Sequence, residues 1–115
     1  IMTELLTKET FLKKVFNFVD NKEWKFEGDK PCIIDFYADW CGPCKSMAPI
    51  LKQLKSELKD AVSIVKINVD TNQSITAKYQ VQGVPTFIIF KKGKQTWRQS
   101  GMQSVSQLKQ AISAH

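Results

Sequence analysis

Hydrophobic positions along the chain alternate between short continuous runs and stripes with helical spacing. One nearly continuous run of strand length, Cys32–Tyr37, predicts a strand buried on both faces, and Ser63–Val69 predicts a second strand. The segment between them predicts a helix, because its apolar residues recur three or four positions apart, at Met47, Ile50, Leu51, Leu54 and Leu58. Strand, helix and strand in this order predict a right-handed crossover that makes the two strands parallel.

The second half of the chain predicts a hairpin and two more helices. Thr86–Phe90 and Gln95–Ser100 flank a polar tip and read as antiparallel strands. The two helices of this half are predicted at Ser74–Tyr79 and Ser104–Ala114. One more helix, Thr7–Val19, is predicted near the start of the chain. We therefore predict one α/β domain over residues 1–115, a central mixed β-sheet flanked by helices on both faces.

Composition agrees with a small globular protein. The 115 residues are 43% hydrophobic and 24% charged, which argues against disorder, and no apolar run approaches the ~20 residues of a membrane span. The net charge of +6 comes from lysines spread along the chain, densest at Lys91, Lys92, Lys94 and Arg98. We interpret this group as a solvated hairpin tip, with a nucleic-acid or membrane patch as the alternative, and expect no nucleic-acid partner.

Nothing at the start resembles an export signal, which predicts a cytoplasmic location. An isoleucine precedes the first methionine, so a signal removed upstream, and with it a periplasmic or other extracytoplasmic location, stays the alternative.

Two cysteines three residues apart stand where the first strand ends and the helix begins. On a helical turn, Cys41 and Cys44 come close enough to form a disulfide. The helix N-terminus should lower the thiol pKa of Cys41 and make it the attacking thiolate. Cys44 lies one turn further in, where we expect it to be more buried and to act as the resolving thiol. Between them, Gly42 adds no charge and Pro43 stiffens the turn without wasting an N–H group.

A metal or haem site is the competing interpretation of this pair. Zinc needs four ligands, and only Cys32 and His115 remain as further candidates. Haem attachment needs a histidine after Cys44, where Lys45 stands instead. The pair therefore predicts dithiol redox chemistry without a metal. Cys32, at the start of a buried strand, is interpreted as a small buried hydrophobe, with a regulatory or dimer-forming thiol as the alternative.

Two motifs together resemble the thioredoxin family. The segment Asp35–Lys45, DFYADWCGPCK, is followed much later by Gly83-Val84-Pro85-Thr86. The similarity extends from about Pro31 to the C-terminus, and Thr7–Val19 fits the first helix of the family. It implies the thioredoxin fold and a protein disulfide reductase activity.

The resemblance also implies roles for two charged residues. Asp35 corresponds to a buried carboxylate behind the second cysteine, which accepts and donates its proton; an aspartate satisfied only by structural hydrogen bonds is the alternative. Lys66 matches a lysine near that carboxylate and could tune it, or could extend from the strand end into water.

A substrate surface follows from the same resemblance. Pro85 corresponds to a cis-proline opposite the cysteines, which would present the Val84 backbone to an extended substrate segment. Trp40 would form a flat apolar wall beside the first cysteine, unless it serves only for packing. Gly83 and Gly101 would keep the groove open, although both also fit ordinary turn glycines.

The chain departs from the family in three features. Tyr37 replaces a tryptophan that is common in thioredoxins, and the connection Asn21–Lys30, with Trp24 and Phe26, is longer than in compact members. We expect these aromatic residues to pin the connection to the body. The positive net charge differs from the acidic balance of many thioredoxins and bears on which partners are recognised.

The uncharged Gly42-Pro43 pair favours a reducing protein, because a histidine before Cys44 would stabilise the Cys41 thiolate and make the disulfide more oxidising. We expect clients with disulfides, no bound cofactor, and a protein electron donor such as a thioredoxin reductase, since no dinucleotide fingerprint is present. Two alternatives are a thiol oxidase or isomerase and a binding subunit without turnover. Nothing in the sequence demands more than a monomer.

Overall fold

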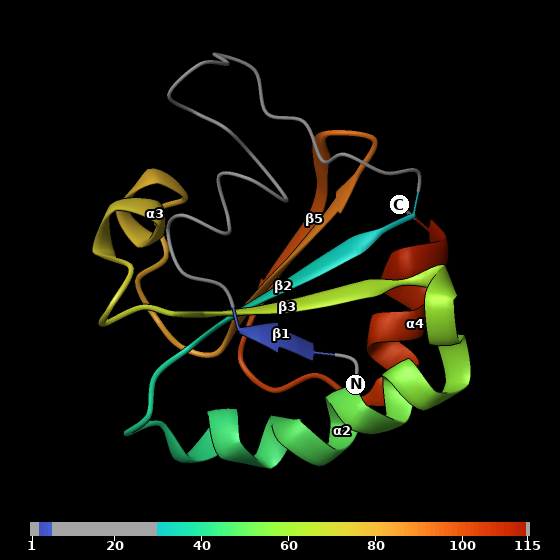
Figure 1. Ribbon diagram of the computed structural model, residues 1–115, viewed down its shortest axis with the longest axis horizontal. Helices are drawn as coiled ribbons and strands as arrows, with labels where there is room; N and C mark the ends of the chain where they lie inside the picture. The colour runs from blue at the N-terminus through green and yellow to red at the C-terminus, as the bar shows by residue number, and fades with distance from the viewer. Residues whose placement is uncertain (1–2, 6–29, 115) are drawn as a thin grey trace.

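Five strands form one mixed sheet in the computed structural model, which describes residues 3–5 and 30–114 (Figure 1). The strands are β1 Thr3–Leu5, β2 Cys32–Tyr37, β3 Ser63–Asn68, β4 Thr86–Lys91 and β5 Lys94–Ser100. Their order across the sheet is β1-β3-β2-β4-β5, with β3 parallel to β1 and β2, and β4 antiparallel to β2 and β5. The predicted parallel crossover and the predicted hairpin are both confirmed.

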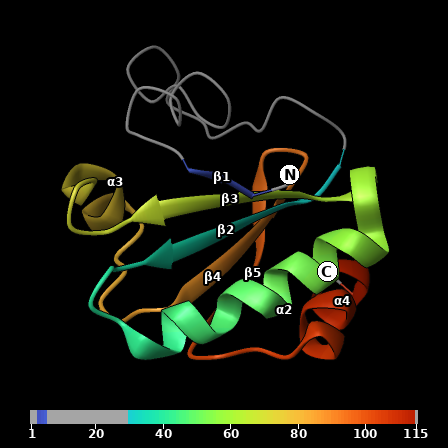
Figure 2. The ribbon, with the colours of Figure 1, turned by 60° about the horizontal axis from the view of Figure 1, so that its bottom comes forward.

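Helices cover both faces of this sheet, as predicted. The long helix α2, Gly42–Leu58, and the last helix α4, Val105–Ala114, lie side by side on one face (Figure 2). The short helix α3, Gln73–Lys78, packs Ile75 onto the other face. A turn of 3-10 helix, η1 Lys59–Ala61, joins α2 to β3.

Element ends differ from the prediction by about one residue, and local hydrogen bonds account for one of these differences. The spacing predicts Ser104 inside the last helix, but Ser104 lies just before it. Its hydroxyl accepts from the Gln107 N–H at 3.0 Å, and its own N–H donates to the Gln107 side chain at 2.8 Å. This reciprocal pair is a capping box, so α4 begins at Val105.

The position of β2 in the centre of the sheet explains why its sequence is almost continuously apolar. Cys32, Ile34 and Phe36 point into the cluster on the α3 face, whereas Ile33 points into the cluster beneath α2 and α4. Both faces of β2 are covered, so both sets of side chains are apolar. Asp35 is the exception, a carboxylate on the α2 face of a buried strand.

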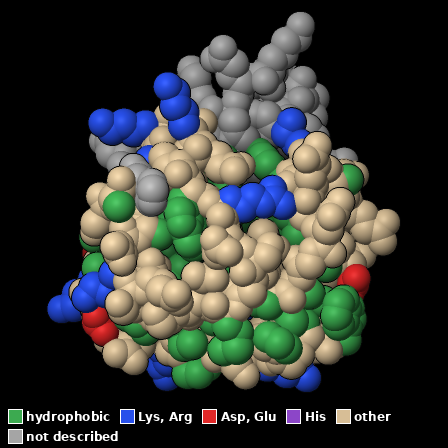
Figure 3. Space-filling model, turned by 180° about the vertical axis from the view of Figure 1, so that it is seen from behind, with side chains coloured by type: hydrophobic (Ala, Val, Ile, Leu, Met, Phe, Trp, Pro, Cys, Tyr) green, Lys and Arg blue, Asp and Glu red, His purple; other side chains and the backbone are tan. Residues whose placement is uncertain are grey.

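The basic residues of the hairpin do not form a free patch. Lys91 donates to the carbonyl of Ile112 in α4. Arg98 donates to the carbonyls of Tyr79 and Gln80, at the end of α3. Elsewhere Lys and Arg are scattered across the face seen in Figure 3. Two of the four cations thus bond to protein carbonyls and join elements together, so for them the interpretation as a solvated hairpin tip is wrong.

Some predictions lie outside the described residues, namely the helix Thr7–Val19, the aromatic pair Trp24 and Phe26, and His115. Among the helices of the described part, none combines the length and the apolar character needed to cross a bilayer.

Candidate active site

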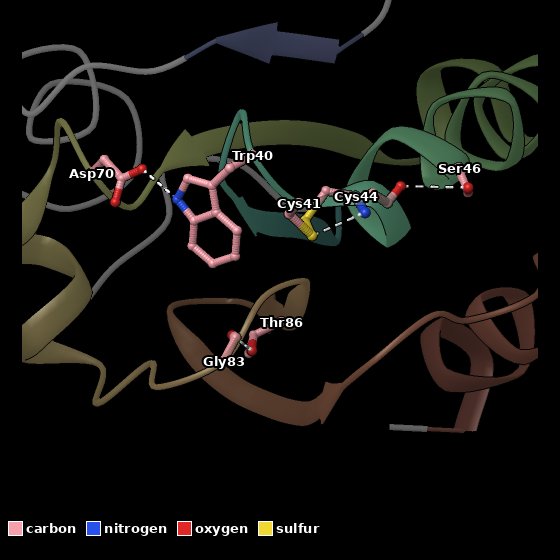
Figure 4. The surroundings of a disulfide bond; sticks show 8 residues. Trp40, Cys41, Cys44, Ser46, Asp70, Gly83 and Thr86 are labelled. Atoms are coloured by element: carbon pink, nitrogen blue, oxygen red, sulfur yellow. Dashed lines mark hydrogen bonds between the residues drawn. A yellow bond between two sulfur atoms is a disulfide. The ribbon is translucent and has the colours of Figure 1, made fainter.

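The two cysteines of the CGPC motif form a disulfide at the N-terminus of α2 (Figure 4). Their Cα atoms lie 5.3 Å apart, within the range that a disulfide requires. Cys41 is the N-cap residue of α2, and its Sγ accepts a hydrogen bond from the Cys44 N–H at 3.1 Å. Pro43 stands in the first turn, where its missing N–H costs nothing. The predicted pairing and its place at the helix start are confirmed.

The expectation that Cys44 is the more buried of the two cysteines is wrong. Cys41 is 4% exposed and Cys44 is 6% exposed. Both pack with Ala38, and three partly buried side chains from different elements, Tyr37, Val69 and Val84, close around this small cluster. Because these neighbours surround the turn as well as the helix, they cover the N-cap cysteine as fully as the one inside the first turn.

Asp35 lies on the sheet face beneath α2, as the resemblance implies. Ile33, two residues before it, packs under α2, and Tyr37, two residues after it, packs against the cysteine cluster. The carboxylate is 1% exposed, and neither of its oxygens has a hydrogen-bond partner. Burial raises the pKa of Asp35 to about 7, although the positive charge of Lys66 lowers it. The alternative, an aspartate satisfied by structural hydrogen bonds, does not fit these oxygens.

Lys66 is the registered neighbour of Asp35 on β3. Its ammonium lies 4.5 Å from the centroid of the Tyr37 ring, a cation–π contact. Tyr37 is partly buried, and burial raises the pKa of its hydroxyl while a hydrogen bond with the Asn68 side chain lowers it. The aromatic ring at the end of β2 therefore contacts both the cysteine cluster and the lysine.

The second motif, Gly83-Val84-Pro85-Thr86, forms a turn that faces the disulfide. The Val84–Pro85 bond is cis, as the resemblance implies, and Val84 packs against the cysteine cluster. The Thr86 hydroxyl donates to the Gly83 carbonyl at 2.6 Å, and the Gly101 N–H donates to the Pro85 carbonyl at 2.8 Å. Figure 4 shows Gly83 and Thr86 facing the disulfide and the Trp40 ring.

The three glycines of the site differ in whether their position could accept a side chain. Gly101 has a φ of +90°, which a side chain rarely adopts. A Cβ atom on Gly42 or on Gly83 would meet no atom within 4 Å, so no neighbour in the described part forces glycine there. An open surface at Gly83 is what the predicted groove needs.

Trp40 is the most exposed large hydrophobic residue of the described part, at 71%, and Met102 follows at 48%. The indole N–H of Trp40 donates to the Asp70 carboxylate at 2.9 Å (Figure 4). An indole held by one hydrogen bond but left open to water is available to a partner. Generic packing, the alternative for Trp40, does not describe such a residue.

Cys32 takes no part in the site. It is 0% exposed and lies in the cluster on the α3 face, on the opposite side of β2 from the disulfide. In the described ranges, no group of three or more His, Cys, Asp and Glu side chains is placed to hold a metal ion. Its interpretation as a small buried hydrophobe agrees with this placement.

Sequence reasoning missed two contributors, Asp70 and the ring contact of Tyr37. A signal for Asp70 was present, because it follows β3, and the carboxyl ends of the parallel strands β2 and β3 meet at one edge of the sheet.

Comparisons with known proteins agree with this geometry. The family model described as Thioredoxin matches residues 3–114. Thioredoxin from Borreliella burgdorferi is 45% identical over 83 residues, 72% of this chain and 71% of that protein. "Thioredoxin Y2, chloroplastic" from Arabidopsis thaliana is 42% identical over 107 residues, 93% of this chain and 63% of that protein.

A crystal structure of chloroplastic thioredoxin z superposes with a TM-score of 0.81 at 28% sequence identity, covering 99% of this chain and 94% of that chain. The same fold, a matching family model and a disulfide-forming CGPC pair at a helix start point to one conclusion. The chain belongs to the thioredoxin family and is a thiol-disulfide oxidoreductase.

Proposed function

We propose that the protein reduces disulfides of client proteins, with Cys41 as the attacking thiol and Cys44 as the resolving thiol. The observation that carries this proposal is the position of Cys41 as N-cap of α2, where its sulfur accepts the Cys44 N–H. A backbone donor and the positive end of the helix stabilise a thiolate on Cys41 after the disulfide is reduced. Cys44, inside the helix, has its sulfur at bonding distance for the second step.

The reaction proceeds in two exchange steps. The Cys41 thiolate attacks one sulfur of the client disulfide, which forms a mixed disulfide and releases the other client sulfur as a thiolate that takes a proton. The Cys44 thiol then loses its proton and attacks Cys41, which restores the Cys41–Cys44 bond and releases the second client thiol. The client disulfide gains two electrons and two protons, and the protein dithiol loses them.

Asp35 is the proposed proton partner of Cys44. A carboxyl with a pKa of about 7 can both accept and donate a proton near neutral pH. Its position beneath the first turns of α2, and the absence of hydrogen-bond partners on its oxygens, support this role. Lys66, whose charge lowers that pKa, is the proposed tuning residue.

The proposed client surface surrounds the disulfide. Trp40 and Val84 supply apolar contacts, and Pro85, Gly83 and Gly101 shape a backbone edge that an extended client segment can join. Hydrophobic side chains gather along the lower edge of the molecule in Figure 3. A mostly backbone-based contact suits a protein that acts on many disulfides.

The proposed context is a reducing compartment and a monomeric protein recharged by a thioredoxin reductase or another protein donor. A cytoplasmic location is our first proposal, and the chloroplastic names of several relatives make an organelle the alternative to test. Fractionation of the native source with antibodies to the chain distinguishes these locations.

Trapping experiments test the covalent mechanism. With dithiothreitol as electron donor and insulin as client, Cys41→Ser should abolish disulfide reduction. In a second experiment, Cys44→Ser is reduced beforehand and the dithiothreitol is removed before insulin is added. This variant should still attack but should not resolve, so that it accumulates a mixed disulfide on a non-reducing gel. Cys32→Ala, which changes the buried cysteine on the α3 face, is the matched control and should keep wild-type turnover.

Two outcomes would contradict the proposal. Activity retained by Cys41→Ser would indicate a binding subunit, and a Cys44→Ser variant that forms no mixed disulfide would remove Cys41 from its attacking role.

Asp35→Asn tests the proton step separately. Loss of the carboxylate should slow resolution of the mixed disulfide by roughly 100-fold near pH 7, the usual contribution of general acid–base catalysis. Formation of the mixed disulfide should change far less. Equal slowing of both steps would assign Asp35 a structural role.

A further inference from the structure

Two groups on the same sheet face are able to attract the Lys66 ammonium. One is the carboxylate of Asp35, which parallel pairing places directly across from Lys66. The other is the ring of Tyr37, two residues further along β2 on the same face. An ammonium on a flexible four-carbon stem can be drawn to either, because one offers a negative charge and the other an aromatic face.

The structure shows which of these two groups contacts the Lys66 ammonium. The Lys66 Nζ lies 4.5 Å from the centroid of the Tyr37 ring. Both Asp35 oxygens are buried without a hydrogen-bond partner. In the described part of the chain, the ion pair between oppositely charged side chains is that of Lys109 with Glu57. The ammonium therefore contacts the ring and makes no ion pair with the carboxylate.

The ring is itself fixed in place. Tyr37 packs against the cluster of Ala38, Cys41 and Cys44. Tyr37 is also partly buried, which restricts its side chain further. The ring therefore presents its face to Lys66 from a packed position.

We propose that Tyr37 is a positioning residue, whose ring holds the Lys66 ammonium off the Asp35 carboxylate and so keeps this carboxylate unpaired beneath α2. A closed Lys66–Asp35 ion pair would keep the carboxylate ionised at neutral pH, where it could no longer donate a proton to Cys44. The inference rests on the proposed function for the use of that proton, but the ring-controlled position of Lys66 is a separate claim.

Few other groups can influence Asp35. Burial and the Lys66 charge are the two causes that set its pKa. On β2 the electrostatically coupled group is Tyr37, and Cys41 and Cys44 of the nearby α2 start do not titrate while disulfide-bonded. From β4 the registered neighbour is Phe87, which is uncharged. A change in the Asp35 pKa on altering Tyr37 can therefore be traced to Lys66 or to hydration.

Carbon-13 NMR titration of the Asp35 side-chain carboxyl in the oxidised full-length protein tests the proposal. Tyr37→Leu should release the ammonium toward the carboxylate and lower the Asp35 pKa by about one unit, a tenfold change in acid dissociation constant, as an opposite charge at close range does. Tyr37→Phe, which keeps the ring, is the matched control and should leave the pKa near that of the wild type. Tyr37→Met serves if the leucine variant does not fold.

The Lys66→Met background separates the proposed cause from hydration. There, Tyr37→Leu should no longer lower the Asp35 pKa, because no ammonium remains to be released. An unchanged or raised pKa in Tyr37→Leu, or an equal fall in both backgrounds, would overturn the proposal. The titration involves no turnover, so a failure here is distinct from a failure of the proposed reductase reaction, which the cysteine variants and Asp35→Asn report.

Discussion

Two carboxylates of this protein lie in opposite environments. Asp35 is buried beneath α2, has no hydrogen-bond partner on either oxygen, and has its pKa raised to about 7, mainly by burial. Glu57, near the other end of α2, is exposed and accepts hydrogen bonds from Lys109 and Gln53, each at 2.9 Å. These hydrogen bonds, that of Lys109 first, hold its pKa below the usual range.

This difference in environment separates Asp35, to which we assign a chemical role, from Glu57, which forms part of the solvated surface. An unpartnered buried carboxylate destabilises the fold in its charged form, and a fold retains such a group where it has a use. A solvated ion pair contributes little to stability and is free to vary. The comparison is worth testing on stability as well as on activity, because the two carboxylates should respond to pH in opposite directions.

The largest expected effect concerns Asp35 and pH. Its pKa is about 7 in the folded protein against an ordinary 3.8, so the folded state binds more protons than the unfolded state between these values. The free energy of unfolding should therefore fall as pH rises through this range, by on the order of 4 kcal/mol at ~1.4 kcal/mol per unit. Asp35→Asn should lose this contribution and be more stable than the wild type at about pH 8.

Urea unfolding of the oxidised wild type and of Asp35→Asn at several pH values measures this difference. Taking the difference between the two proteins removes the opposing contribution of Glu57 and other groups. Parallel curves, with the same stability difference at pH 4 and at pH 8, would show that the buried carboxyl does not titrate as described.

An intermediate effect is expected at Asp70, an exposed carboxylate with one partner at the site. Asp70→Ala removes the acceptor of the Trp40 indole N–H and should raise KM for a protein client roughly 2- to 10-fold, as expected for one hydrogen bond, with little change in kcat. Asp70→Asn keeps an oxygen acceptor and is the matched control. If both variants bind clients like the wild type, the indole needs no anchor.

The smallest effect is expected at the exposed pair. Glu57→Gln and Lys109→Met should leave client reduction unchanged and shift unfolding midpoints by less than the scatter of the measurement, because the two side chains are solvated. Insulin reduction and urea unfolding at low and at high salt measure both. A clear loss of stability at low salt would mean that this pair joins α2 to α4 more firmly than its exposure indicates.

Much of the fold could be predicted because its central strands are short segments rich in β-branched and other apolar residues. Cys32–Tyr37 and Ser63–Asn68 stand out for this reason, and the helix between them fixes their parallel direction. β1 was missed, since three residues at Thr3–Leu5 carry no period of their own and are ordered by pairing with β3. Periodicity detects elements that bury a face locally and not those that a partner strand orders.

The candidate site was predictable in its members more than in its contacts. The motif spacing located Cys41 and Cys44 on one helical turn, and the resemblance supplied Asp35 and Pro85. The similar burial of the two cysteines depends on Tyr37, Val69 and Val84, which three separate segments bring together. The Tyr37–Lys66 contact likewise depends on the register of β2 and β3, which no local pattern encodes.

The most direct test of the central claim is the reduction potential of the Cys41–Cys44 couple, equilibrated against defined thiol buffers. We predict a value more negative than that of the glutathione pool, at about −240 mV, as a protein that delivers electrons to disulfides requires. A value near that of protein disulfide isomerase, about −180 mV, would contradict the account and indicate a protein that forms disulfides instead.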